Sequence, residues 1–141
     1  MLQSYRMKCF SGSLDSGVTY NGKPAHVSQR TSLEGAVILA SRSEIKRGEW
    51  KRFEKAAVKI RPMGSVAYKL ALVSAGLADI TFTLTPKHEW DIAAGAALVS
   101  SAGGFISTLE RRRCGAIASR PAFRVSWLAE FSARSPARSG E

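Results

Sequence analysis

Cysteine, acidic side chains and long apolar runs are all scarce in this sequence of 141 residues. The two cysteines, Cys9 and Cys114, lie far apart and match no metal-binding spacing, so they predict no disulfide framework and favour a reducing compartment. The most apolar window, residues 92–106, is interrupted by glycine and serine and is too short to span a bilayer. Residues 1–6 lack the continuous apolar segment of a signal peptide. A soluble, cytoplasmic protein is therefore the default expectation.

Basic side chains dominate the charge that is present. Lys and Arg outnumber Asp and Glu by 21 to 11, which gives a formal net charge of +10. This balance suits an anionic partner such as a phosphate ester, a nucleotide or a nucleic acid. The alternative is a solvated helix face together with a basic tail, since residues 110–141 hold seven Arg against three Glu. Charge is the sole support for a nucleic-acid-binding domain.

Apolar runs and helical patterns alternate along the middle of the chain. Strands are predicted at residues 36–40, 58–61, 80–84 and 105–109, and helices at 43–57, 66–75 and 92–102. This order predicts a layered α/β domain with a mainly parallel sheet. In such a sheet, ligands gather where strands end and helices begin, and Gly64-Ser65 and Glu89-Trp90-Asp91 lie at two such junctions.

The remaining segments carry weaker patterns. Asn21-Gly22 predicts a hairpin, because both residues tolerate a positive φ. Pro62 is expected to end the strand before it, and the basic, aromatic-containing helix at 43–57 is interpreted as an amphipathic surface helix rather than a nucleic-acid-binding one. Three further segments complete the expectations: a loop at 9–16, a helical turn at 127–131 and disorder at 132–141.

The stretch from Glu89 to Gly104 carries the most informative pattern in the sequence. Asp91 precedes a helical pattern of small and aliphatic residues, and Asp is a favoured N-cap. Ala93, Ala94 and Gly95 leave the first turn open to a ligand or to another backbone. From the residues alone, a capped core helix and a metal ligand at Asp91 both remain open.

The motif Trp-Asp-x-Ala-Ala-Gly at residues 90–95, followed by Leu98-Val99 and Ala102-Gly103-Gly104, resembles the second signature of the inositol monophosphatase-like superfamily. The resemblance reaches back to the Asn-Gly hairpin and covers residues 17–109. It implies the C-terminal half of the sugar-phosphatase (αβαβα) fold, Mg²⁺-dependent phosphatase chemistry, and Asp91 as a metal ligand. Residues 1–16 are then an irregular N-terminal segment, and 110–141 a divergent basic tail, partly disordered.

Two other signatures of that superfamily do not occur in this sequence. They are a Gly-Glu-Glu segment and an Asp-Pro-x-Asp-Gly-Thr segment, which supply further metal ligands and lie N-terminal to the hairpin. Since Mg²⁺ needs several oxygen ligands, we expect an incomplete fragment that is inactive by itself. Surface left by the missing half is expected to promote association.

The substrate side is also implied by the resemblance. Gly64-Ser65 is similar to the helix start that lies beside substrate in the family, and Ser65 is either a hydrogen-bond donor to substrate or a plain N-cap. Lys69, one turn later, either meets a second phosphate or is a solvated lysine. Glu89 is interpreted as a residue supporting the metal ligands or as exposed, and Trp90 as a core anchor rather than a base-stacking residue.

These features resemble the 3'(2'),5'-bisphosphate nucleotidase branch more than the animal inositol phosphatases. The implied function is a hydrolase that removes the 3'-phosphate of adenosine 3',5'-bisphosphate or a related nucleotide. The alternatives are an inositol or sugar phosphate phosphatase, a non-catalytic α/β remnant that keeps ligand contacts, and a basic nucleic-acid-binding domain.

Overall fold

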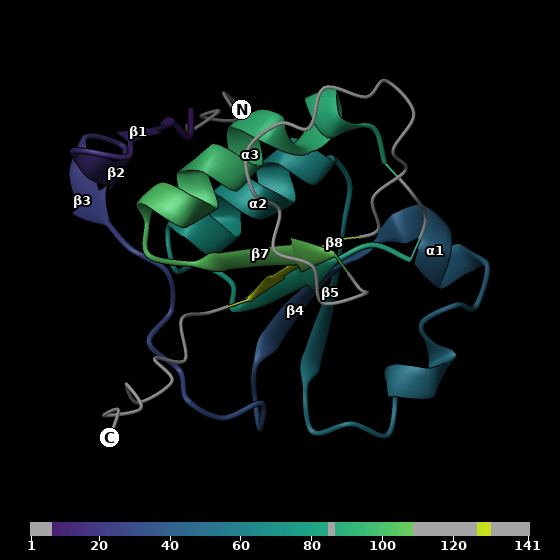
Figure 1. The fold of residues 1–141 in the computed structure, drawn as a ribbon. Helices are drawn as coiled ribbons and strands as arrows, with labels where there is room; N and C mark the ends of the chain where they lie inside the picture. The colour runs from purple at the N-terminus through teal and green to yellow at the C-terminus, as the bar shows by residue number, and fades with distance from the viewer. Residues whose placement is uncertain (1–6, 85–86, 109–126, 131–141) are drawn as a thin grey trace, which may run out of the picture.

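The computed structural model describes residues 7–84, 87–108 and 127–130, which form two sheets and two long helices (Figure 1). The strands are β1 (Phe10–Ser13), β2 (Gly17–Tyr20), β3 (Lys23–Ala25), β4 (Val37–Ser41), β5 (Lys59–Met63), β6 (Ile80–Phe82), β7 (Phe105–Thr108) and β8 (Trp127–Glu130). The helices are α1 (Arg42–Lys46), the 3₁₀ turn η1 (Lys51–Phe53), α2 (Val66–Ser74) and α3 (Glu89–Ser101).

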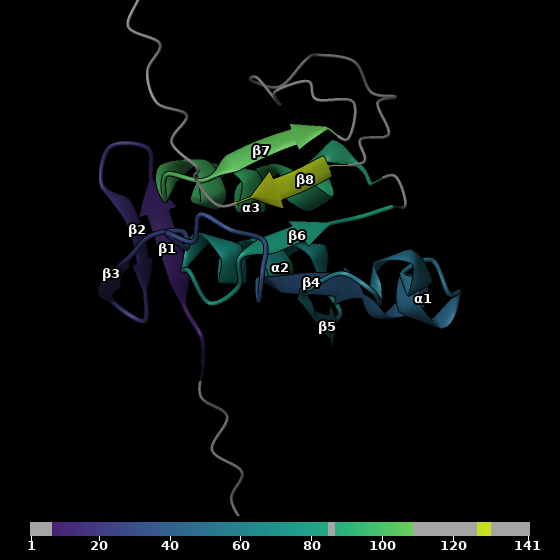
Figure 2. The same cartoon turned by 90° about the horizontal axis from the view of Figure 1, so that it is seen from below.

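The main sheet has the order β5-β4-β6-β8-β7. β4 pairs in parallel with β5 and β6, while β8 is antiparallel to β6 and to β7. Helices α2 and α3 lie side by side on one face of this sheet, as Figures 1 and 2 show from two directions. The predicted α/β architecture is confirmed, and the strands predicted at 36–40, 58–61, 80–84 and 105–109 correspond to β4, β5, β6 and β7 of this sheet.

Alternate residues of the buried strands point to opposite faces of the sheet and enter two separate cores. Leu39 packs with Leu70, Val73 and Val99 in the core beneath α2 and α3. On the other face, Ile38 and Ala40 pack with aromatic side chains from the α1–η1 segment and β6: Trp50, Phe53 and Phe82. The continuous apolar run at 36–40 is therefore explained by burial on both faces.

The small sheet is a β1-β2-β3 meander at the end of the molecule opposite α1 (Figure 2). Asn21 and Gly22 form the predicted tight turn between β2 and β3, with φ values of 50° and 80°. The loop predicted at 9–16 was wrong in part, because residues 10–13 form β1 and pair with β2 in an antiparallel ladder. Polar residues alternate through this edge strand, so it carries no apolar signal.

Two predictions for the segment after β4 were also wrong. The single helix at 43–57 is divided into α1 and η1, because Gly48 adopts φ +76°, a left-handed conformation that ends a helix. β5 does not stop at Pro62 but continues to Met63. Since β5 is an edge strand paired with β4 alone, the missing N–H of proline removes no ladder bond that the sheet needs.

Near the end of the chain, residues 127–130 form strand β8 instead of the predicted helical turn, because they pair with β6 and β7. The disorder predicted at 132–141 lies outside the described residues. In the described ranges, none of the helices has the length and hydropathy that crossing a lipid bilayer requires.

Candidate functional site

The candidate site lies at the edge of the sheet where β4, β5 and β6 end. Because these strands are parallel, their carboxyl ends share one edge, and α1, α2 and α3 begin there. The segment after β4 packs on one face of the sheet, whereas the helix after β6 lies on the other. Neighbouring strands whose connections leave toward opposite faces create the crevice where ligands of α/β sheets usually bind.

Ser65 caps α2 at this edge. Its hydroxyl oxygen accepts a hydrogen bond from the Tyr68 backbone N–H at 3.3 Å, so the N-cap interpretation is confirmed. Its φ of +59° is rare for a residue with a Cβ, and such backbone conformations cluster at functional sites. The hydroxyl still has a proton to donate, and Gly64 beside it is exposed. Donation to a substrate stays a prediction.

Asp91 lies in the first turn of α3 and is exposed. The N-cap of this helix is His88, so the prediction that Asp91 caps it was wrong. The chain turns into the helix earlier than the apolar pattern indicated, and the Asp91 N–H donates to the His88 carbonyl at 3.1 Å. Its carboxylate makes no hydrogen bond or ion pair with the described residues. A cleft shared with Ser65 stays a prediction.

Gly95, one turn after Asp91, faces α2 rather than a ligand. A Cβ at this position would stand 2.6 Å from the Leu70 Cβ, so only glycine permits this approach of the two helices. Both helices begin at the carboxyl edge of the sheet. The contact therefore fixes the Asp91 end of α3 against the Ser65 end of α2.

Trp90 is 71% exposed, so its interpretation as a core anchor was wrong. Its indole stacks on the His88 imidazole, with ring centroids 4.3 Å apart and planes 7° apart. Large aromatic side chains are usually buried, which is why the sequence favoured a core position for Trp90. The sequence alone could not show that few of the described residues pack against this side chain. Glu89 begins α3, and its two predicted roles stay untested.

Lys69 is 2% exposed, so the solvated-lysine alternative was wrong. Burial lowers the pKa of its ammonium; the nearby Glu44 carboxylate opposes this shift, and Lys87 adds to it. The ammonium makes no hydrogen bond within the described ranges. Lys69 and Lys87 are therefore close enough to repel each other, and the Glu44 carboxylate is close enough to attract Lys69.

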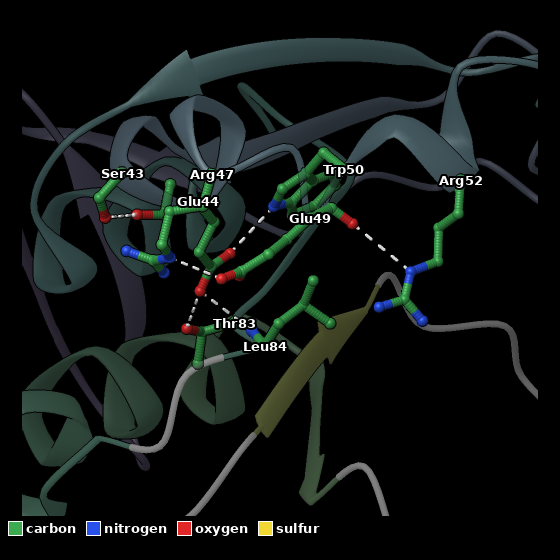
Figure 3. A network of polar contacts seen from close by, with 9 residues as sticks. Ser43, Glu44, Arg47, Glu49, Trp50, Arg52, Thr83 and Leu84 are labelled. Carbon is green, nitrogen blue, oxygen red and sulfur yellow. Dashed lines mark hydrogen bonds and ion pairs between the residues drawn. The ribbon is translucent and has the colours of Figure 1, made fainter.

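A polar network missed by the sequence reasoning lies beyond the carboxyl ends of β4 and β6 (Figure 3). Glu44 is 1% exposed, and its Oε1 accepts from Thr83 Oγ1 at 2.7 Å and from the Leu84 N–H at 3.1 Å. Its Oε2 accepts from Trp50 Nε1 at 2.9 Å. One signal could have revealed this: Glu44 and Thr83 are polar residues that each follow one of two adjacent parallel strands.

The described residues do not complete a metal centre. Among them, no group of three or more His, Cys, Asp or Glu side chains is close enough to hold an ion. Asp79 lies at the opposite edge of the sheet, where it accepts from the Val37 N–H at 2.7 Å and pairs with Arg30 at 3.3 Å. Asp91 can therefore offer one ligand, which does not satisfy Mg²⁺.

A shallow cavity of about 380 Å³ lies away from this edge. It is bounded by β3 and by Ala75 and Gly76, beyond the C-terminal end of α2. None of the predicted site residues lines it. The predicted site residues Ser65, Lys69 and Asp91 belong instead to α2 and α3, which begin at the carboxyl edge.

Comparison with known proteins matches residues 2–130 to the model of the inositol monophosphatase family. The chain is 36% identical over 104 residues to a fructose-1,6-bisphosphatase/inositol-1-monophosphatase of Thermotoga maritima, covering 72% of this chain and 40% of that protein. It is 33% identical over 117 residues to the Nus factor SuhB of Pseudomonas aeruginosa, covering 76% of this chain and 42% of the relative.

Solved structures give the same result. A Thermotoga maritima IMPase superposes with a TM-score of 0.73 at 29% identity, over 87% of this chain and 46% of that one. The extragenic suppressor protein SuhB of Bartonella henselae gives 0.71 at 29% identity, over 88% and 48%. The chain thus spans less than half the length of these proteins, and the match extends beyond both ends of the predicted domain at 17–109.

Proposed function

Because the chain belongs to the inositol monophosphatase family, we propose that it supplies one half of the site of a Mg²⁺-dependent phosphomonoesterase acting on a 3'-phosphorylated nucleotide such as adenosine 3',5'-bisphosphate. The observation that carries this proposal is the position of Asp91. Its carboxylate is exposed in the first turn of α3, at the edge of the sheet where α/β proteins bind ligands.

Asp91 would contribute one of the metal ligands. Mg²⁺ takes about six oxygen ligands, so the others must come from segments such as Gly-Glu-Glu and Asp-Pro-x-Asp-Gly-Thr, which this sequence lacks. When bound, the metal would neutralise phosphoryl charge and activate water. Because most of the metal ligands would come from outside this sequence, we predict that this chain by itself hydrolyses phosphate esters negligibly.

The substrate side would be formed by the start of α2 and by Lys69. Ser65 has a hydroxyl proton to donate, Gly64 leaves open space beside it, and a helix N-terminus favours an anion. Lys69 and the half-buried Lys87 add positive charge beyond this point. A second phosphate would use that charge, which favours a bisphosphate over an inositol or sugar phosphate, the second choice of substrate.

The exposed first turns of α3 would be the surface that meets the metal-binding half. Trp90, Ala93 and Ala94 are exposed there, and apolar surface of this kind marks contacts with other protein parts. Association through this surface, in the cytoplasm, is part of the proposal.

A non-catalytic module that binds small phosphorylated ligands is the alternative, favoured by the lack of a three-ligand cluster in the described ranges. A nucleic-acid-binding role is the weakest candidate. It would show as steeply salt-dependent binding to random DNA, whereas the first two functions require selective binding of small bisphosphates.

The experiment assays the purified chain with adenosine 3',5'-bisphosphate and inositol 1-phosphate, alone and together with a supplied segment carrying the two absent motifs. We expect negligible turnover alone and Mg²⁺-dependent turnover after addition. Asp91→Asn should reduce that turnover roughly a thousandfold, because metal-assisted chemistry fails as a unit. Asp15→Asn, an exposed carboxylate in the β1–β2 turn, is the matched control. Robust turnover by the isolated chain would refute the proposal, and so would a complemented enzyme indifferent to Asp91→Asn.

A further inference from the structure

Lys87 and Asp91 of the candidate site follow β6 in the chain, and described residues on both sides of them contact other elements. After them, Gly95 within α3 packs against Leu70 of α2. Before them, Thr83 and Leu84 both donate to the carboxylate of Glu44. Glu44 belongs to α1, which follows a different strand and packs on the other face of the sheet.

We propose that Glu44 is a positioning residue of the candidate site: its carboxylate fixes residues 83–84 at the carboxyl edge of the sheet, shortly before Lys87 and the first turn of α3 in the chain. This inference rests on the proposed function for the importance of Asp91. The positioning itself depends only on the contacts of Glu44.

The chemistry of the network requires a carboxylate. The Trp50 indole N–H and the Leu84 backbone N–H can only donate, and each occupies a different oxygen of Glu44 (Figure 3). A glutamine has one oxygen and one NH₂ group. In either orientation, its NH₂ would face one of these two donors, so Glu44→Gln keeps the shape and loses an acceptor.

Aromatic packing holds Trp50, the residue that donates to the Glu44 carboxylate, in place. The Trp50 ring stacks on Phe82, with centroids 4.5 Å apart, and Phe82 is the residue immediately before Thr83. Trp50 thus orients Glu44 through its N–H and the end of β6 through its ring. The α1–η1 segment therefore acts as a clamp on the end of β6 and on residues 83–84.

Stability alone does not account for a buried carboxylate at this place. Apolar side chains of similar volume often stabilise a core as well as a buried charge or better, because the charge loses its hydration. Glu44 instead orients two donors by hydrogen bonding, the Leu84 backbone N–H and the Thr83 hydroxyl. Its negative charge also opposes the effect of burial on the pKa of the Lys69 ammonium, which helps to keep that group charged beside the site.

The test compares Glu44→Gln with Val73→Ala by NMR at a temperature where both variants are fully folded. Val73 is fully buried at the end of α2 far from the connection, so it reproduces a loss of stability without touching the clamp. For Glu44→Gln we expect shifted amide resonances from Lys87 to Asp91, and Leu84 amide exchange roughly tenfold to a hundredfold faster. Val73→Ala should leave both readouts as in the original chain.

Thr83→Val covers the case in which Glu44→Gln does not fold. It removes one donor to Glu44 and keeps the shape, so the same resonances should shift by a smaller amount. Unchanged Lys87–Asp91 resonances in the folded variants would overturn the positioning role.

Enzymology separates this inference from the proposed function. In the complemented enzyme, Glu44→Gln should lower kcat/KM and Val73→Ala should not. If the complemented original chain hydrolyses no phosphate ester while Glu44→Gln still shifts the resonances, the proposed function fails and the positioning stands. Normal kcat/KM for Glu44→Gln in an active enzyme would overturn the role of Glu44 in the candidate site.

Discussion

The two faces of the main sheet are stabilised in different ways. The face under α2 and α3 is an apolar core in which Leu39, Leu70, Val73 and Val99 are completely buried. The face under α1 and η1 is a small aromatic cluster with a buried carboxylate at its edge. Apolar contact has no preferred direction, whereas hydrogen bonds to Glu44 set the placement of specific atoms. We infer that the first face contributes most of the stability, whereas the second determines where residues 83–84 lie.

The largest effect should come from the apolar face. Leu70→Ala removes a fully buried side chain that also contacts Gly95, so unfolding free energy should fall by about 2–5 kcal/mol. Urea denaturation measures this change. Leu77→Ala is the control, because Leu77 is 44% exposed and should cost far less. Equal losses in the two variants would contradict the assignment of stability to this core.

A smaller effect is expected on the aromatic face. Trp50→Phe keeps an aromatic ring to pack on Phe82 but removes the N–H that donates to Glu44, which should cost about 1.5–3 kcal/mol. The same substitution at Trp90, which is 71% exposed, should change the free energy of unfolding very little. A larger loss at Trp90 than at Trp50 would break the comparison.

Lys69 belongs to α2 and interacts electrostatically with Glu44 of α1, and its effect should appear in the pH dependence of stability. Burial lowers the pKa of Lys69 in the folded chain, so between that lowered pKa and the ordinary value of 10.5 the unfolded chain binds more protons. This group therefore makes stability rise as pH rises through that window. Lys69→Met should abolish this contribution, and Lys46→Met, at an exposed position, should retain it. Denaturation at several alkaline pH values measures the difference, and identical profiles would contradict the burial of Lys69.

The smallest change in stability is expected for an exposed ion pair near α1. Arg47 pairs with Glu49 at 2.6 Å, but half of the Arg47 side chain is exposed, so water and salt screen the pair. Arg47→Ala should therefore change the free energy of unfolding less than Trp50→Phe does. A loss as large as that of Trp50→Phe would show that charge outside the network contributes to the placement of α1.

The sequence predicted the apolar face well and the polar face poorly. Helical spacing in α2 and α3 and the continuous run in β4 are local patterns, and local patterns identify elements. Glu44 could not be interpreted in that way, because its partners lie 39 and 40 residues further along the chain. Its burial also contradicts the polar face expected for a surface helix at 43–57, which ends early because Gly48 adopts a positive φ.

The site residues show the same limit. Ser65 was identified from a junction motif, and the structure adds a strained backbone that no sequence pattern reports. A solvated position was one of the two predictions for Lys69, and Trp90 was expected in a core; the burial of Lys69 and the exposure of Trp90 contradict both. Residue type gives an average tendency to be buried, and the neighbours that decide each case come from distant segments.

The approach of Gly95 to Leu70 also has a consequence for how this chain can change over evolutionary time. A side chain at position 95 needs the space that Leu70 fills, so neither position can vary freely without the other. Among homologous sequences, alanine or serine at 95 should accompany a smaller residue at 70, and the two positions should covary. Paired substitutions that enlarge 95 while reducing 70 should be tolerated where the single enlargement is not.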